Sequence, residues 1–217
     1  MAFHIIMSFT IIVARYNEPI TWTNEFPNVL IYNKGINNLD ESYNQIMLDN
    51  VGREGHTYYK YIVDNYDNLK DYTCFLQGNP FDHSPNIIDN LHKCIEDLNA
   101  MSFNIINTIP NPVLDKSLKC CTIDFKYLSE RVFRTTLDLE CRRNWQCKNI
   151  HSNFEKIFGM KCRDDCVFGA GAQFIISKDR ILKRPVQFYE TIVKMLEYTI
   201  DPIEGHDIER FHKYIFS

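Results

Sequence analysis

The sequence has no excess of positive charge, no long hydrophobic run and no low-complexity tract. Its 24 lysines and arginines face 28 aspartates and glutamates, for a formal net charge of −4. Such a chain as a whole does not attract duplex nucleic acid or an anionic membrane, so any anion site must be local. The apolar residues 3–14 lack a basic start and a cleavage site, and they are too few to span a bilayer. We expect neither a nucleic-acid partner nor a membrane span.

The chain also lacks any Asn-x-Ser/Thr acceptor for N-glycosylation, although it is rich in asparagine. This absence disfavours secretion and favours a cytoplasmic protein. Its 8 cysteines are too sparse for the disulfide framework of a small secreted module. Cys141, Cys147, Cys162 and Cys166 lie close together, but with looser spacing than zinc ligands usually have. We expect reduced thiols, ahead of a disulfide or a zinc site.

The length, apolar content and patterning of the sequence predict a single α/β domain. The length of 217 residues and the 45% apolar content are typical of one globular domain. Apolar runs of strand length occupy residues 9–14, 29–32 and 72–76, and helical spacing marks residues 54–65 and 87–98. The order strand, strand, helix, strand, helix predicts a mainly parallel sheet flanked by helices. Residues 1–7 would be a short lead-in.

The second half of the chain has a different pattern. We expect a loop at residues 108–116, a helix at 127–139, an irregular cysteine-rich stretch at 140–168, a strand after Gly171, and helices near 185–198 and 207–216. The domain over residues 8–217 would then combine a nucleotide-binding half, 8–100, with an acceptor-binding half, 101–217.

Polar residues follow two of the predicted strands. Arg15, Asn17 and Glu18 close the first strand, and Gln77 and Asn79 follow the third. Ligands of open α/β folds bind at the carboxyl ends of parallel strands, so these groups are suited to contact a nucleotide. The alternative is an ordinary exit from a strand with a surface ion pair.

The segment NVGREGHTYY, residues 50–59, places two glycines and Arg53 at the start of a helix. Free N–H groups at a helix N-terminus favour an anion, and an arginine adds a bidentate phosphate donor. The segment is not a G-x-x-x-x-G-K-[ST] phosphate loop. A glycine-lined helix start with an exposed Arg–Glu pair is the alternative.

Two further segments contain candidate ligands. In QGNPFDH, Asp82 and His83 offer an oxygen and an imidazole to a divalent cation, or else they cap the next helix. In FGAGAQF, the small residues around Gly169, Gly171 and Gln173 allow close approach of a sugar or phosphate, or else tight packing of a helix on a strand.

The C-terminal segment EGHDIERFHKYIF has polar residues that core packing does not explain. Its apolar stripe accounts for the isoleucines and phenylalanines, but not for His206, Asp207 and Glu209. A histidine and carboxylates at a helix start suit a metal ligand and a general base. The alternative is that Asp207 caps the helix, whose charged face is solvated.

Together these segments resemble a known family. IIVARYNE, IYNKG, NVGREGHTYYKYIVDNYDNL, FLQGNPFDH, GAGAQFIISKDRI and ERFHKYIF are similar to GT-A-like glycosyltransferases of fungi and large DNA viruses, including the small capsid glycosyltransferase of chlorella-infecting viruses. The resemblance covers residues 8–216. It implies a GT-A fold that moves a hexose or pentose from a nucleotide-sugar donor, expected to be UDP-linked, to a glycan or glycoprotein hydroxyl. It also implies that the protein is located in the cytoplasm of an infected host cell.

The resemblance assigns roles residue by residue. The nucleotide would be flanked by Ala14, Arg15, Tyr16, Asn17, Lys34, Arg53, Gln77, Gly78 and Asn79. Gln77 to Asn79 would replace the Asp-x-Asp motif of metal-dependent members, and neutral amides cannot balance the charge of a cation. Either Asp82 with His83 or His206 restores a Mn²⁺ or Mg²⁺ site, or Arg15, Lys34 and Arg53 perform its electrostatic role.

An inverting enzyme of this family also needs a base for the acceptor hydroxyl. Asp207 is the first candidate and Glu209 the second. A retaining mechanism would not need that base. The amides at Gln77 and Asn79 keep one alternative open, a non-catalytic module of the same fold that binds a nucleotide-sugar or a carbohydrate.

Overall fold

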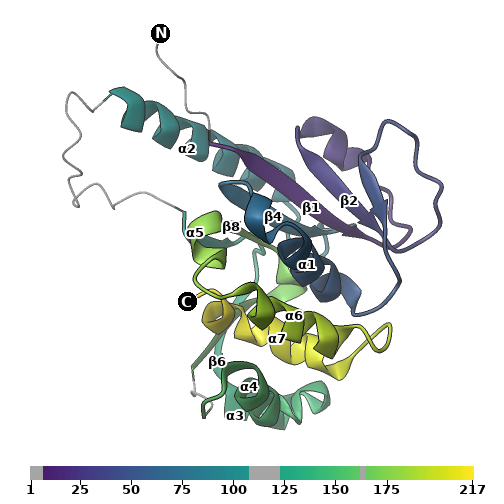
Figure 1. Cartoon of the computed structure of the whole chain (residues 1–217), viewed down its shortest axis with the longest axis vertical. Helices are drawn as coiled ribbons and strands as arrows, with labels where there is room; N and C mark the ends of the chain where they lie inside the picture. Colours follow the sequence, from purple (N-terminus) through teal and green to yellow (C-terminus); the bar gives the residue numbers. More distant parts are fainter. Residues whose placement is uncertain (1–6, 108–122, 162–164) are drawn as a thin grey trace.

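The computed structural model describes residues 7–107, 123–161 and 165–217. Its centre is a six-stranded mixed sheet in the order β3-β2-β1-β4-β8-β5 (Figure 1). The parallel strands are β1 (Phe9–Arg15), β2 (Val29–Asn33), β3 (Gln45–Met47) and β4 (Tyr72–Gln77). β8 (Phe174–Ser177) runs antiparallel to both β4 and β5 (Phe125–Tyr127). The predicted α/β class and mostly parallel sheet are confirmed.

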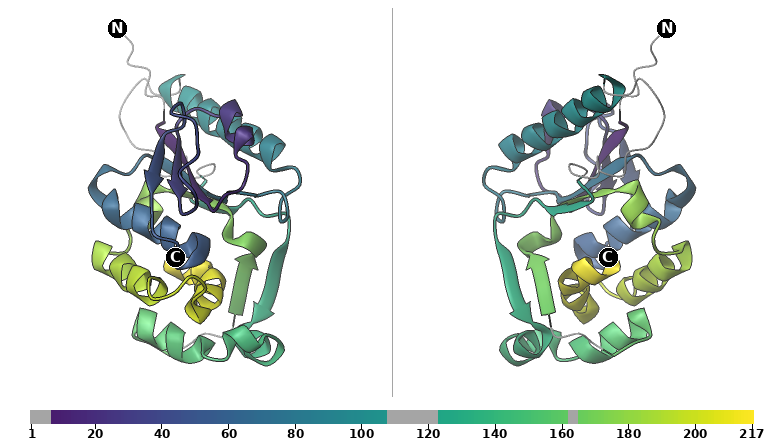
Figure 2. Two further views of the ribbon diagram at one scale, coloured as in Figure 1. Left: turned by 90° about the vertical axis from the view of Figure 1, so that its right-hand side faces the viewer. Right: turned by 90° about the vertical axis from the view of Figure 1, so that its left-hand side faces the viewer.

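Helices cover both faces of this sheet (Figure 2). Ile11 and Val13 of β1 share a core cluster with α2 (Ile87–Asn107), whereas Ile12 belongs to the cluster of α1 (Arg53–Asp64). Outside α1 lie α6 (Val186–Leu196) and α7 (Ile203–Ile215). Burial on both faces explains why the central strands are continuous apolar runs in the sequence.

A small lobe extends from one end of the sheet. It consists of the antiparallel strand pair β6 (Val132–Thr136) and β7 (Asp165–Gly169), with the helices α3 (Leu137–Arg143) and α4 (Ile150–Phe158) between them in the chain. The predicted helix at 127–139 and irregular stretch at 140–168 are therefore wrong. β-branched residues favour a strand up to Thr136, whose side chain then caps α3 by accepting a hydrogen bond from the Leu139 N–H at 3.1 Å.

The remaining elements are short. They are the 3₁₀ turns η1 (Thr21–Glu25), η2 (Tyr66–Asn68), η4 (Trp145–Cys147) and η5 (Ala170–Ala172), and the one-turn helix α5 (Lys178–Ile181). The expected lead-in and the expected loop at 108–116 lie, apart from Met7, outside the described residues. None of the described helices is long and apolar enough to cross a membrane.

Helix α7 joins the small lobe to the sheet. The Asn153 amide donates to Asp207 Oδ2 at 2.7 Å, Arg210 Nε donates to Glu140 Oε2 at 2.8 Å, and Tyr214 bonds to Asp165. The helix was expected to begin at residue 207, but it begins at Ile203, directly after Pro202. Asp207 is therefore an interior residue of the helix and not its cap.

Two of the four clustered cysteines, Cys141 and Cys147, are free thiols. Cys166 is buried in β7, and Cys162 lies outside the described residues. Within the described part of the chain, no group of three or more His, Cys, Asp or Glu side chains could hold a metal ion. The structure therefore offers no zinc site from these three cysteines.

Candidate functional site

The first cavity opens where the direction of the sheet connections reverses. β1 pairs with β2 on one side and with β4 on the other. The chain therefore runs from β1 outward to β2 and β3, and then crosses back to the other side of β1 to form β4. A crevice forms at the carboxyl ends of such strands. This strand-end cavity has a volume of about 520 Å³. Its walls are formed by Ala14, Arg15, Tyr16, Glu18, Lys34, Asn50, Arg53, Glu54, Gln77, Gly78, Asn79, Asp82 and Ile200.

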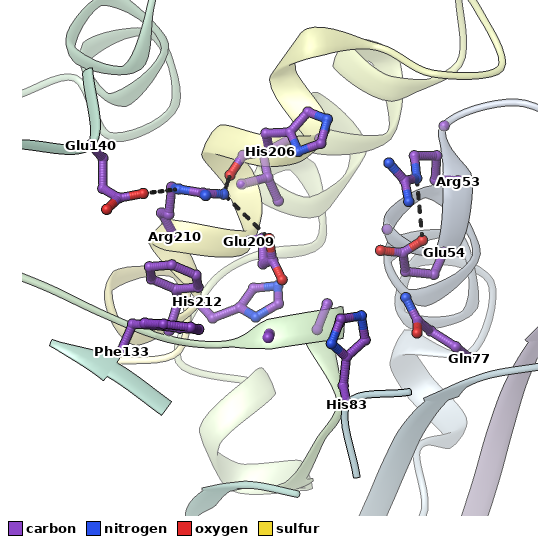
Figure 3. A pocket seen from close by; sticks show the side chains of 18 of the residues that line it. Arg53, Glu54, Gln77, His83, Phe133, Glu140, His206, Glu209, Arg210 and His212 are labelled. Carbon is purple, nitrogen blue, oxygen red and sulfur yellow. Dashed lines mark hydrogen bonds and ion pairs between the residues drawn. The ribbon is translucent and has the colours of Figure 1, made fainter. Parts of the chain in front are cut away.

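A second cavity of about 490 Å³, the lobe cavity, lies between α1, α7 and the small lobe (Figure 3). Its walls include His83, Phe133, Glu140, Arg143, Phe168, Gly171, His206, Glu209, Arg210 and His212. Arg53, Glu54 and Gln77 line both cavities. The two spaces therefore adjoin at these three residues.

The strand-end cavity brings together the residues predicted to bind a nucleotide, with one exception. Asn17 does not line it. The backbone of Asn17 has a positive φ of 65°, and its side-chain oxygen accepts a hydrogen bond from the Ile36 N–H at 2.7 Å. Asn17 therefore shapes the loop after β1.

Two of the predicted cations are used to build the cavity wall. Arg15 is 4% exposed, and its guanidinium donates to the Glu18 carbonyl and to the side chains of Asn33 and Asn38. The Lys34 ammonium donates to the carbonyl oxygens of Val51 and Arg53, and burial lowers its pKa to about 8. Both charges hold the loops beside α1 in place.

Arg53 differs from Arg15 and Lys34 because its guanidinium makes only long contacts with its neighbours. Its side chain is 48% exposed, and its nearest carboxylate oxygens are 3.5 Å away on Asp201 and 3.7 Å away on Glu54. It follows Gly52, whose φ of 63° would strain any other residue and whose added Cβ would lie 2.7 Å from the Leu196 carbonyl oxygen. The guanidinium is available to an anion at the junction of the two cavities.

The three predicted metal ligands are not gathered at one place. Asp82 lines the strand-end cavity, where its carboxylate accepts from the Asn79 amide at 3.2 Å. His83 and His206 line the lobe cavity instead. These residues do not form a resident metal site, because they are divided between two cavities.

Glu209 is the carboxyl group of α7 that lines the lobe cavity. Figure 3 shows it between Arg210 and His83, facing the side formed by Arg53, Glu54 and Gln77. Burial raises its pKa to about 7, against the opposing effect of Arg210 and with a further rise from Glu54. A carboxyl group that titrates near neutral pH is suited to accept a proton from a ligand.

Asp207, the first candidate for the base, lines neither cavity. It is fully buried, where it accepts the hydrogen bond of Asn153, and burial raises its pKa to about 6. A ligand in the lobe cavity cannot reach a carboxyl group that is enclosed between α7 and α4. The reason is that the Asp207 side chain faces Asn153 on α4, whereas Glu209 of the same helix faces the cavity.

The predicted substrate loop is divided in the same way. Gly171 lines the lobe cavity, but Gly169 and Gln173 do not. Gln173 is fully buried, and its amide donates to the Pro80 carbonyl at 2.9 Å. A Cβ on Gly169 would lie 2.8 Å from the Tyr127 ring. Tight packing therefore explains Gly169 and Gln173.

Residues 11–217 match the family described as "Protein of unknown function (DUF3431)". The chain belongs to this family. No curated protein and no solved structure matches it. The family match links DUF3431 neither to glycosyltransferases nor to viruses, so the chemistry must be inferred from the two cavities.

The DUF3431 chain also has cavity residues that the sequence did not indicate. Phe133, Glu140 and Arg143 come from the small lobe, whose elements were predicted wrongly. The Phe133 side chain is 47% exposed and stacks on Phe168, with ring centroids 5.2 Å apart. No local pattern in the sequence marks these residues, because β6 is mostly exposed and lacks the alternation of a half-buried strand.

Proposed function

We propose that this protein is a glycosyltransferase that moves a sugar from a nucleotide-diphosphate donor, with UDP as the expected nucleotide, to a hydroxyl group of a glycan or glycoprotein. One observation carries the proposal: two cavities of similar size adjoin at Arg53, Glu54 and Gln77. A transferase needs two substrates whose reacting atoms meet at one place, and two adjoining cavities provide that arrangement.

The strand-end cavity suits the nucleotide-sugar donor. Tyr16 is 53% exposed at the end of β1 and offers an aromatic face to a nucleobase. Arg53 and the first turn of α1 supply a charged fork and helix N–H groups for the diphosphate. The sugar would then extend past Gln77 toward the lobe cavity.

The lobe cavity suits the acceptor. An acceptor hydroxyl beside Glu209 loses its proton to the carboxylate as its oxygen attacks the anomeric carbon of the sugar. The bond from that carbon to the diphosphate oxygen breaks, and the electron pair leaves with the diphosphate, whose negative charge Arg53 stabilises. Attack from the side opposite the leaving group inverts the anomeric centre.

A second function is favoured by one observation. The strand end carries the amides Gln77 and Asn79, and Asp82, Glu18 and Glu54 are the carboxylates on the wall of the strand-end cavity. A transferase must stabilise the negative charge that develops on the leaving diphosphate, whereas a protein that only binds a nucleotide-sugar or a carbohydrate does not. This non-catalytic module is the alternative.

A panel of nucleotides and nucleotide-sugars tests both functions. Thermal shifts are measured with and without Mn²⁺, and each nucleotide-sugar that binds is then incubated with glycan acceptors while release of free UDP is followed. A shift with turnover supports the transferase, and a shift without turnover supports the binding module. If neither a nucleotide nor a nucleotide-sugar shifts the melting temperature, the transferase and the nucleotide-sugar-binding module both fail.

A further inference from the structure

Three charged side chains from two elements form a chain along the wall of the lobe cavity (Figure 3). Arg210 Nε on α7 lies 2.8 Å from Glu140 Oε2 on α3, and Arg210 Nη1 lies 3.3 Å from Glu209 Oε2. The side chains of Glu140, Arg210 and Glu209 are only 14%, 8% and 18% exposed. Solvent therefore screens these interactions weakly.

The guanidinium of Arg210 is held firmly in this position. Its Nη1 also donates to the His206 carbonyl at 2.7 Å, and its central carbon lies 4.5 Å from the centre of the Phe168 ring. An arginine in a protein does not lose its proton, so one fixed positive charge is shared by two carboxylates. The shorter contact is with Glu140, which leaves Glu209 less stabilised as an anion than it would be in an isolated pair.

We propose that Glu140 is a positioning residue that controls, through Arg210, whether Glu209 carries a charge. The proposal rests on the proposed function, because it gives Glu140 a role in the reaction only if Glu209 is the base. Without Glu140, the whole charge of Arg210 would favour the Glu209 carboxylate. The base would then ionise at lower pH and bind a proton less readily.

Other groups also face Glu209 and must be held constant. From α1 these are Arg53, Glu54 and Tyr58, and from β5 it is Tyr127. His83 faces it from the loop after β4, His206 and His212 from its own helix, and the N–H groups of Gly171 and Ala172 from η5. A change at Glu140 alters none of these side chains.

Carbon-13 NMR of the glutamate carboxyl carbons tests the proposal on the full chain. The Glu209 signal is assigned by its loss in Glu209→Gln and followed from pH 4 to 9. We expect its midpoint to fall by about one pH unit in Glu140→Gln, at the low end of the shifts that a nearby charge causes. Glu140→Asp keeps the charge but draws it back from Arg210, so its midpoint should fall by less.

The matched control is Asp138→Asn. Asp138 lies on the same short helix and has its own partner, with Oδ1 2.9 Å from His151 Nε2, but it does not contact Arg210. Its removal should leave the Glu209 midpoint unchanged. An unchanged midpoint in folded Glu140→Gln, or in folded Glu140→Asp if Glu140→Gln does not fold, overturns the proposal, as does an equal shift in Asp138→Asn.

The titration and the transfer assay separate this proposal from the proposed function. If the Glu209 midpoint falls in Glu140→Gln but no sugar is transferred by the wild type, the charge coupling stands and the proposed function fails. If sugar is transferred and the midpoint does not move, the positioning role fails alone. When both hold, the acid limb of the transfer rate should shift to lower pH together with the midpoint.

Discussion

Gly171 lies against the imidazole of His83, so closely that a Cβ on Gly171 would be 2.4 Å from His83 Cδ2. The two residues come from different parts of the chain, His83 from the loop after β4 and Gly171 from the turn before β8, and both line the lobe cavity. The backbone of Gly171 also has a φ of 76°. The shape of the cavity here depends on the absence of a side chain.

Gly171→Ala should therefore destabilise the fold more than an alanine at another glycine of similar backbone. Gly159 has a φ of 66° and open space around its Cβ position, so Gly159→Ala carries only the backbone cost of ~1 kcal/mol. Displacing His83 adds roughly 1–3 kcal/mol at Gly171. Urea denaturation of the two variants measures the difference, and equal losses would contradict the close contact.

Arg53→Ala should weaken UDP binding by ~1.5–3 kcal/mol, the contribution of a hydrogen bond to a charged group. Fold stability should hardly change, because the ion pairs of Arg53 are solvent-exposed. Titration calorimetry gives the affinity. Arg142→Ala is the control, since Arg142 is exposed on α3 and lines neither cavity. An unaltered affinity in folded Arg53→Ala would remove Arg53 from the phosphate site.

The sheet and its helices could be predicted because their signals are local. The apolar runs of β1, β2 and β4 and the periodicity of α1 follow from burial of neighbouring residues. The small lobe gave no such signal. Val132 and Phe133 of β6 are 45% and 47% exposed, so this strand lacks the alternation that marks a half-buried strand.

The candidate site was predictable only in part, because some of its residues are placed by contacts between distant parts of the chain. Residues at the ends of β1 and β4 meet because parallel strands end at the same edge of a sheet, which the sequence pattern indicates. The environment of Asp207 depends on Asn153, which is 54 positions away in the sequence. No local pattern distinguishes such a buried carboxyl group from a helix cap.

Asp207 should make the fold less stable as pH rises. Its folded pKa of about 6 exceeds the ordinary 3.8, so its contribution to stability is full below pH ~4 and is lost through pH ~6. A difference of roughly two units corresponds to on the order of 3 kcal/mol. Between pH 4 and 7, Asp207→Asn should therefore gain about that much stability relative to the wild type.

Urea denaturation of both proteins across this range checks the Asp207 prediction. The buried His56 and His212, whose pKa values burial lowers to about 4 and about 3, add an opposite pH dependence, but they do so equally in both proteins. Asp67→Asn serves as the control because Asp67 is exposed. A stability difference that does not vary with pH would show that Asp207 does not titrate as described.

Glu209→Gln should reduce sugar transfer by ~10²–10⁴-fold, the usual contribution of a general base. The active form is the carboxylate and its pKa is about 7, so the wild-type rate should rise with pH through about 7 and level off above it. UDP binding should persist in the variant, because Glu209 lines the lobe cavity and not the strand-end cavity. Initial rates from pH 5.5 to 8.5 at saturating donor measure the profile.

The control for Glu209→Gln is Glu204→Gln. Glu204 is a carboxylate in the first turn of the same helix, where it accepts a hydrogen bond from the Tyr198 hydroxyl at 2.7 Å and lines neither cavity. Its removal should leave both the rate and its pH dependence close to those of the wild type. If Glu209→Gln retains the wild-type rate while folded, the acceptor hydroxyl loses its proton elsewhere, and the inverting mechanism through Glu209 is wrong.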